Sequence, residues 1–111
     1  MLSVSPATRI FVALNPVDMR QGFNGLFSYA QVVLQQDVLT GHLFVFTNRL
    51  RNRLRLLWWD GSGLWLCTKR LERSSFAWPS GEGASLCIRP EELQLLLHGI
   101  EGTPRPRWYR T

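Results

Sequence analysis

Cysteine, lysine and long apolar runs are scarce in this sequence of 111 residues. The two cysteines, Cys67 and Cys87, are too few for a disulfide framework or a structural zinc site, so we expect two reduced, largely buried thiols. No apolar run approaches the roughly 18 residues that span a bilayer, and the first residues lack the basic segment and apolar core of a secretory signal. These features favour a cytoplasmic protein with no membrane partner.

Positive charge is abundant and of one chemical kind, because Lys69 is the only lysine among 13 basic residues. The 8 acidic residues leave a formal net charge of +5. Arginine carries a planar charged fork that suits phosphate, although codon usage in a GC-rich genome would also enrich it. Nucleic acid is therefore a candidate partner, beside a purely solubilising role for the charge.

The hydrophobic pattern predicts an α+β fold with one globular domain over residues 1–102 and a basic Pro/Arg-rich mobile tail over residues 103–111. We expect an antiparallel β-meander packed by a long N-terminal helix and a short C-terminal helix. Five short apolar runs read as strands, and the last of them as an edge strand. These runs cover residues 9–14, 43–47, 53–59, 64–71 and 84–88.

The long helix is expected over about residues 19–36, where apolar residues recur at helical spacing. Asp18 and Gln21 precede this stripe at the spacing of a capping box, in which side chains satisfy free backbone N–H groups. The short helix is expected to begin at Pro90, because proline suits the first position of a helix.

Candidate catalytic groups are few. His42 and His98 stand alone, without the spacing of a metal site. A metal-dependent nuclease needs several converging carboxylates, for which Asp18, Asp60 and Glu72 are the candidates. Capping explains Asp18 and a turn explains Asp60, so we expect no catalytic residue, metal or cofactor, and an enzyme is only an outlying alternative.

Basic residues recur at every second position between residues 49 and 55. We expect the first two in a hairpin loop and the last two on a strand, with the basic residues near position 70 brought to the same end by antiparallel pairing. The alternative is a solvated strand edge that charge protects from aggregation. The predicted DNA-binding residues, including those of the tail, are Arg49, Arg51, Arg53, Arg55, Lys69, Arg70, Arg73, Arg105, Arg107, Trp108 and Arg110.

The tryptophans differ in what their positions indicate. Trp58 and Trp59 are adjacent in a predicted strand, so their side chains must point to opposite faces of the sheet. Trp65 and Trp78 are expected to pack rather than to offer stacking platforms. Trp108 lies on the basic tail, where it suits base stacking or a groove on a partner.

Five ordered words of the sequence resemble one small bacterial family. The chain is similar, over about residues 8–102, to the TnpB accessory proteins, the second open reading frame products of the insertion-sequence family sixty-six. These proteins are distinct from the RNA-guided nucleases of the same name. The words are 18–26 (DMRQGFNGL), 41–46 (GHLFVF), 57–61 (LWWDG) with Gly63 and Leu64, 69–72 (KRLE) and 76–79 (FAWP).

The resemblance implies an accessory role in the transposition of a mobile genetic element, beside a separate and larger transposase that cuts and joins DNA. It supplies no catalytic residues to carry over. Two hypotheses follow. In the first, the chain binds element DNA, mainly through its phosphates, the larger transposase, or both. In the second, it acts as a protein-interaction adaptor for the transposase with no direct DNA contact. A second copy of the chain is a further candidate partner.

Overall fold

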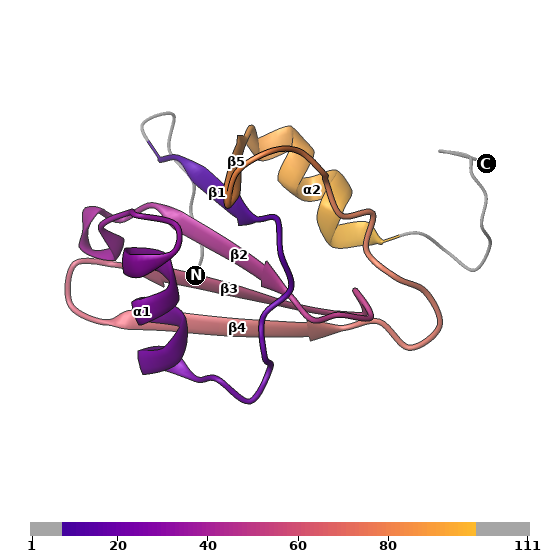
Figure 1. Ribbon diagram of the computed structural model, residues 1–111, viewed down its shortest axis with the longest axis horizontal. Coiled ribbons are helices and arrows are strands. Elements are labelled where there is room, and N and C mark those ends of the chain that lie inside the picture. Colours follow the sequence, from indigo (N-terminus) through magenta and orange to yellow (C-terminus); the bar gives the residue numbers. More distant parts are fainter. Residues whose placement is uncertain (1–7, 100–111) are drawn as a thin grey trace.

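A five-stranded sheet forms the centre of residues 8–99, which are the residues that the computed structural model describes (Figure 1). The α+β class is confirmed, and two predicted strands have the bounds that the sequence indicates. In chain order the elements are β1 (Ile10–Ala13), α1 (Phe23–Val32), the 3-10 turn η1 (Val38–Thr40), β2 (Leu43–Thr47), β3 (Arg53–Trp59), β4 (Leu64–Arg70), β5 (Ser85–Ile88) and α2 (Pro90–His98).

The sheet is mixed, so the prediction of an antiparallel meander is wrong. Its strand order is β4-β3-β2-β1-β5, and β1 pairs with β2 in parallel, with Ile10 opposite Leu43. The other three pairings are antiparallel. The reason is the connection between β1 and β2, which contains α1 and η1 and is long enough to return the chain in the same direction.

The first helix is shorter than expected and lies between two strands rather than at the start of the domain. Gly22 occupies its N-cap position without a side-chain cap, so the predicted capping box is wrong. The helix ends well before residue 36, because Gln35 adopts the left-handed conformation with φ 56° and the Gln36 amide donates to the carbonyl oxygen of Ala30. Glutamine is uncommon in that conformation, so the pattern did not mark this end.

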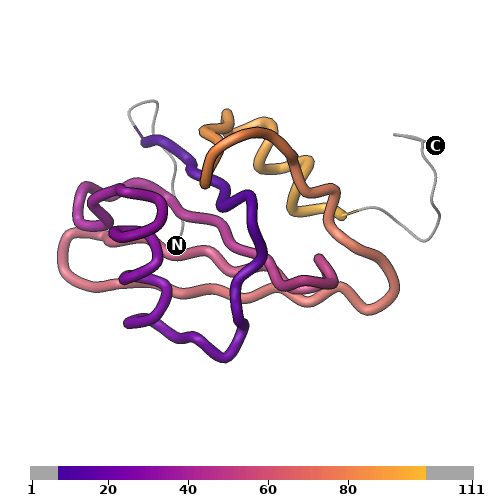
Figure 2. The backbone as a smooth tube through the Cα atoms, viewed as in Figure 1, coloured from indigo at the N-terminus to yellow at the C-terminus, as the bar shows by residue number. Residues whose placement is uncertain are grey.

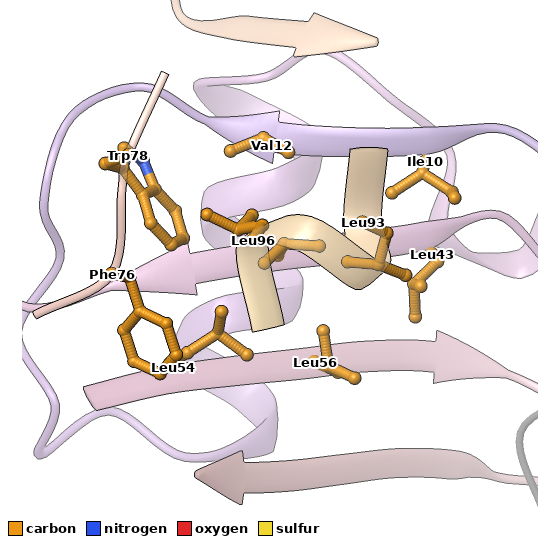
Figure 3. Packing of buried hydrophobic residues seen from close by; sticks show 10 residues of the cluster. Ile10, Val12, Leu43, Leu54, Leu56, Phe76, Trp78, Leu93 and Leu96 are labelled. Atoms are coloured by element: carbon orange, nitrogen blue, oxygen red, sulfur yellow. The ribbon is translucent and has the colours of Figure 1, made fainter. Parts of the chain in front are cut away.

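Side chains alternate between the two faces of the sheet, and each face packs against one helix. In Figure 3, α2 lies in front of the strands and α1 behind them. The face toward α2 carries Ile10, Val12, Leu43, Val45, Leu54 and Leu56, which pack with Leu93, Leu96, Phe76 and Trp78. The opposite face carries Phe11, Ala13, Phe44, Phe46 and Leu57, which pack with Leu26, Ala30 and Val38.

The tryptophans adopt three different environments. Trp58 packs on the α2 face and stacks on Trp65, with ring centroids 5.3 Å apart and planes 9° from parallel. Trp59 pairs in register with Leu64, which belongs to the opposite face. Trp78 is buried, and its indole N–H donates to the carbonyl oxygen of Ala13 at 2.8 Å.

Both cysteines are free and exposed, so the prediction of largely buried thiols is wrong. Cys67 lies on β4 and Cys87 on β5, the two outermost strands of the sheet. Neither helix covers these strands fully, because each packs against the central ones.

Candidate nucleic-acid interface

Three segments far apart in the sequence meet at one end of the sheet, which we call the basic end: residues 14–22, 47–55 and 67–76. Backbone hydrogen bonds join them, from Val17 N to the oxygen of Thr47 at 2.8 Å and from Phe76 N to the oxygen of Arg51 at 2.7 Å. The loops after β2 and after β4 lie at the right-hand end of the tube in Figure 2. The three segments therefore lie side by side at this end of the sheet.

Charge is segregated along the strand direction. The basic end contains eight cationic side chains and two carboxylates. The opposite end, where β1 and β2 begin and β3 and β5 end, carries four carboxylates and two arginines, namely Asp37, Asp60, Glu91, Glu92, Arg9 and Arg89. The cations of the basic end are Arg20, Arg49, Arg51, Arg53, Arg55, Lys69, Arg70 and Arg73, and its carboxylates are Asp18 and Glu72.

The structure brings together the seven predicted basic residues between positions 49 and 73, but distributes them over two faces. Arg53 lies opposite Arg70 in the β3–β4 pairing, on the face toward α1. Lys69 lies opposite Leu54, on the face toward α2. Like charges directly opposite each other are unfavourable, and Glu72 offsets this cost by pairing with Arg70 at 3.1 Å.

Besides Arg70, two of the predicted DNA-binding side chains are engaged within the protein, and both donate to backbone carbonyl oxygens. The half-buried Arg55 donates from Nη1 to the carbonyl oxygen of Gln21, just before α1. The Lys69 ammonium group donates to the carbonyl oxygen of Leu97 at 2.7 Å, at the end of α2. Both side chains therefore hold a helix end against the sheet.

Besides Arg55, which donates to a backbone carbonyl oxygen, four arginines of the basic end form no ion pair with any described residue: Arg49, Arg51, Arg53 and Arg73. Three of them are exposed, and Arg51 is partly buried. Free, exposed guanidinium groups are the form in which arginine contacts phosphate.

The loop that carries Arg49 and Arg51 is fixed by two asparagines. The Asn48 carboxamide oxygen accepts from the backbone N–H groups of Asn52 and Arg53, each at 3.1 Å. Its amide nitrogen donates to the side-chain oxygen of Asn52 at 2.7 Å. This clamp closes the loop on itself and leaves its tip outside, where Leu50 is 72% exposed.

The carboxylates do not converge on a common point. Asp18 pairs with Arg20 at 2.7 Å, and this hydrogen-bonded arginine lowers the Asp18 pKa to about 2. Asp60 lies at the opposite end, where the backbone N–H of Ser62, the Trp65 indole and the N–H of Gly63 lower its pKa. Glu72 pairs with Arg70. Each carboxylate is bound by its own sequence neighbours.

Sequence reasoning missed Arg20 and Leu50. The Arg20 side chain is 91% exposed and borders a cleft of about 460 Å³ lined by residues 16–20 and 48–50. Its position depends on the contact between residues 17 and 47, which no local pattern encodes. The only feature of the sequence that could have marked Leu50 as a surface residue is its position between two arginines.

The tail residues Arg105, Arg107, Trp108 and Arg110 lie outside the described residues. The last described residue, Gly99, lies against Leu71 and Ser75, and a side chain there would collide with Leu71. The chain therefore leaves the described part beside the basic end (Figure 1).

Residues 8–99 contain no group of three His, Cys, Asp or Glu side chains that could hold a metal ion. Neither described helix has the length and apolar character needed to cross a bilayer.

These observations define a small α+β domain with one segregated basic surface. A family model described as "IS66 Orf2 like protein" matches residues 8–106. The chain belongs to this family, which confirms the resemblance read from the five sequence words and indicates a transposition accessory protein.

Two proteins of Sinorhizobium fredii (strain NBRC 101917 / NGR234) are similar to nearly the whole chain. "Uncharacterized protein y4hO" is 42% identical over 112 residues, which cover 100% of this chain and 97% of that protein. "Uncharacterized protein y4jC" is 42% identical over 103 residues, which cover 93% of this chain and 88% of that protein. No solved structure matches the chain.

Proposed function

We propose that this protein assists the transposition of an insertion sequence by binding duplex DNA through the basic end. The observation that carries the proposal is the segregation of eight cations against two carboxylates at one end of the sheet. A concentrated positive surface attracts the phosphate backbone and releases its condensed counterions.

The contacts would be made mainly to phosphate oxygens. Arg49, Arg53 and Arg73 are exposed and, among the described residues, carry no acidic partner, so their guanidinium groups are available to a ligand. Phosphate contacts orient a protein on DNA without reading its sequence. Binding through these groups would therefore be similar on unrelated DNA sequences.

The cutting and joining steps would belong to the separate transposase. The arrangement of the carboxylates supports this part of the proposal, since two-metal nucleases need carboxylates around one pair of cations. Asp18 and Glu72 each pair with an arginine, and Asp60 lies at the far end of the strands.

A second candidate function is that of an adaptor that docks the transposase without touching DNA. A groove of about 220 Å³ between β5 and α2 favours it. Its walls include Leu86 and Leu95, which are 40% and 56% exposed, beside Pro79 and Ile88. Exposed apolar side chains around a groove are typical of a protein interface.

The two functions separate in a pair of measurements on the full chain. The variant with Arg49→Ala, Arg53→Ala and Arg73→Ala should lose most of its DNA affinity, whereas Arg9→Ala, an exposed arginine just before β1, should retain it. Capture of the purified transposase should weaken after nuclease treatment if DNA bridges the two proteins. The adaptor function would be favoured if the triple variant kept its DNA affinity and nuclease treatment left the capture of the transposase unchanged.

A further inference from the structure

An exposed leucine stands at the tip of the β2–β3 loop, between two arginines. Leu50 is 72% exposed, more than the other apolar side chains of the basic end, such as the buried Val17. Its neighbours Arg49 and Arg51 are cationic, so a partner that covers Leu50 must also accept two positive charges. A leucine left in water forgoes the favourable free energy of burial, which a bound partner could recover.

The loop holds this leucine outward and cannot easily fold it back. The Asn48 and Asn52 side chains are bonded to each other at 2.7 Å across the base of the loop. The Arg51 amide donates to the carbonyl oxygen of Asn48 at 3.1 Å, and the Arg51 carbonyl oxygen accepts from Phe76 N at 2.7 Å. Arg51 itself has φ 59°, which turns the chain sharply after the tip.

We propose that Leu50 is a wedge that enters the minor groove of bound DNA and partly unstacks one base step. The inference rests on the proposed DNA binding and adds what the loop does once phosphates are engaged. Apolar side chains such as leucine are used as wedges between base steps, and they kink the duplex toward the major groove. Arg49 and Arg53 would then contact phosphates on either side of the insertion.

Charge identifies DNA rather than protein as the occupant. The tip lies on the surface with eight cations, while the apolar groove beside Leu86 and Leu95 lies between β5 and α2. A polyanion satisfies the arginines and offers stacked, apolar base faces to the leucine. A wedge of this kind favours flexible pyrimidine–purine steps, because they cost least to unstack.

The test uses the full chain and a short duplex with 2-aminopurine in a central TA step, whose fluorescence rises when that base unstacks. The parent protein should raise the fluorescence at saturation. Leu50→Ala should abolish the rise and weaken binding roughly tenfold, because it removes most of the buried leucine surface. The salt dependence of DNA binding by Leu50→Ala should equal that of the parent protein, since no phosphate contact is lost.

Three controls separate the wedge from other effects. Leu95→Ala truncates an exposed leucine on α2 and should leave both fluorescence and affinity as in the parent. Leu50→Met keeps a long apolar side chain and should retain the rise. Arg49→Ala should reduce the salt slope by about one phosphate contact while the saturated fluorescence persists. Thermal unfolding checks that each variant folds.

The outcomes distinguish this inference from the function beneath it. The wedge is overturned if the parent protein binds DNA without any change in fluorescence and Leu50→Ala does not weaken that binding. The proposed DNA binding would still hold in that case. A parent protein that does not bind DNA overturns both. Loss of transposase capture by Leu50→Ala, with DNA binding unchanged, overturns the wedge by assigning the loop tip to a protein partner.

Discussion

The ammonium group of Lys69 lies 2.7 Å from the carbonyl oxygen of Leu97, and this contact ties strand β4 to the last turn of α2. A lysine at a helix C-terminus also interacts favourably with the helix dipole. The only lysine of the chain therefore has a structural partner, although its position in the sequence placed it among the DNA-binding residues.

Replacing this lysine should affect the fold more than DNA binding. Lys69→Ala should lower the free energy of unfolding by about 0.3–1 kcal/mol, the usual range for a cation near a helix C-terminus. Urea unfolding measures the change, and the salt slope of DNA binding should remain that of the parent. A slope reduced by one contact, with unfolding unaffected, would instead make Lys69 a phosphate ligand.

Trp78→Phe should destabilise the domain by about 1–3 kcal/mol, because it leaves the Ala13 carbonyl oxygen buried without its donor. Trp65→Phe is the matched control. It removes the hydrogen bond to Asp60 at 2.7 Å, but from a side chain that is 45% exposed, so water can replace the donor. Equal losses in the two variants, measured by urea unfolding, would contradict the buried hydrogen bond.

Asp18 should titrate near pH 2, below its ordinary value of 3.8, because Arg20 stabilises the carboxylate. Since the folded pKa is the lower one, the pair stabilises the fold fully above about pH 3.8, and this contribution disappears as the pH falls toward 2. NMR titration of the carboxyl carbon should show the midpoint rising in Arg20→Gln. An unchanged midpoint would contradict the ion pair as the cause of the lowered Asp18 pKa.

Both thiols should react with a chromogenic disulfide reagent in the native protein, because Cys67 and Cys87 are exposed. The folded chain should release two equivalents of chromophore without denaturant, and Cys67→Ser and Cys87→Ser should each lower the yield by one. If the thiols react only after unfolding, both cysteines are buried, as the sequence alone predicted, and their exposure in the structure is contradicted.

Local sequence patterns predicted the strands and helix starts that depend on the residues of the segment itself. The runs at residues 43–47 and 53–59 became β2 and β3 with those bounds, and Pro90 begins α2. The parallel pairing of β1 with β2 could not be predicted in this way, because it depends on how the intervening chain packs. The end of α1 at Gln35 depends on a left-handed residue that is not glycine.

The candidate site, like the fold, was predictable from local patterns only in part. Antiparallel pairing of the runs at residues 53–59 and 64–71 correctly predicted that Arg53 and the basic residues near position 70 share one end of the hairpin. Which of them are engaged within the protein could not be predicted, since Arg55 and Lys69 bind carbonyl oxygens 34 and 28 residues away in the chain. Such contacts exist only after both helices have packed on the sheet.

The salt dependence of DNA binding tests the central claim most directly. If Arg49, Arg51, Arg53 and Arg73 each neutralise one phosphate, log K should fall against log salt with a slope of about −3.6 on duplex DNA. Replacing Arg49, Arg53 and Arg73 by alanine should flatten the slope by about 2.7, while the Arg9→Ala control should keep the parent slope. A triple variant with the affinity and slope of the parent would contradict DNA binding by the basic end.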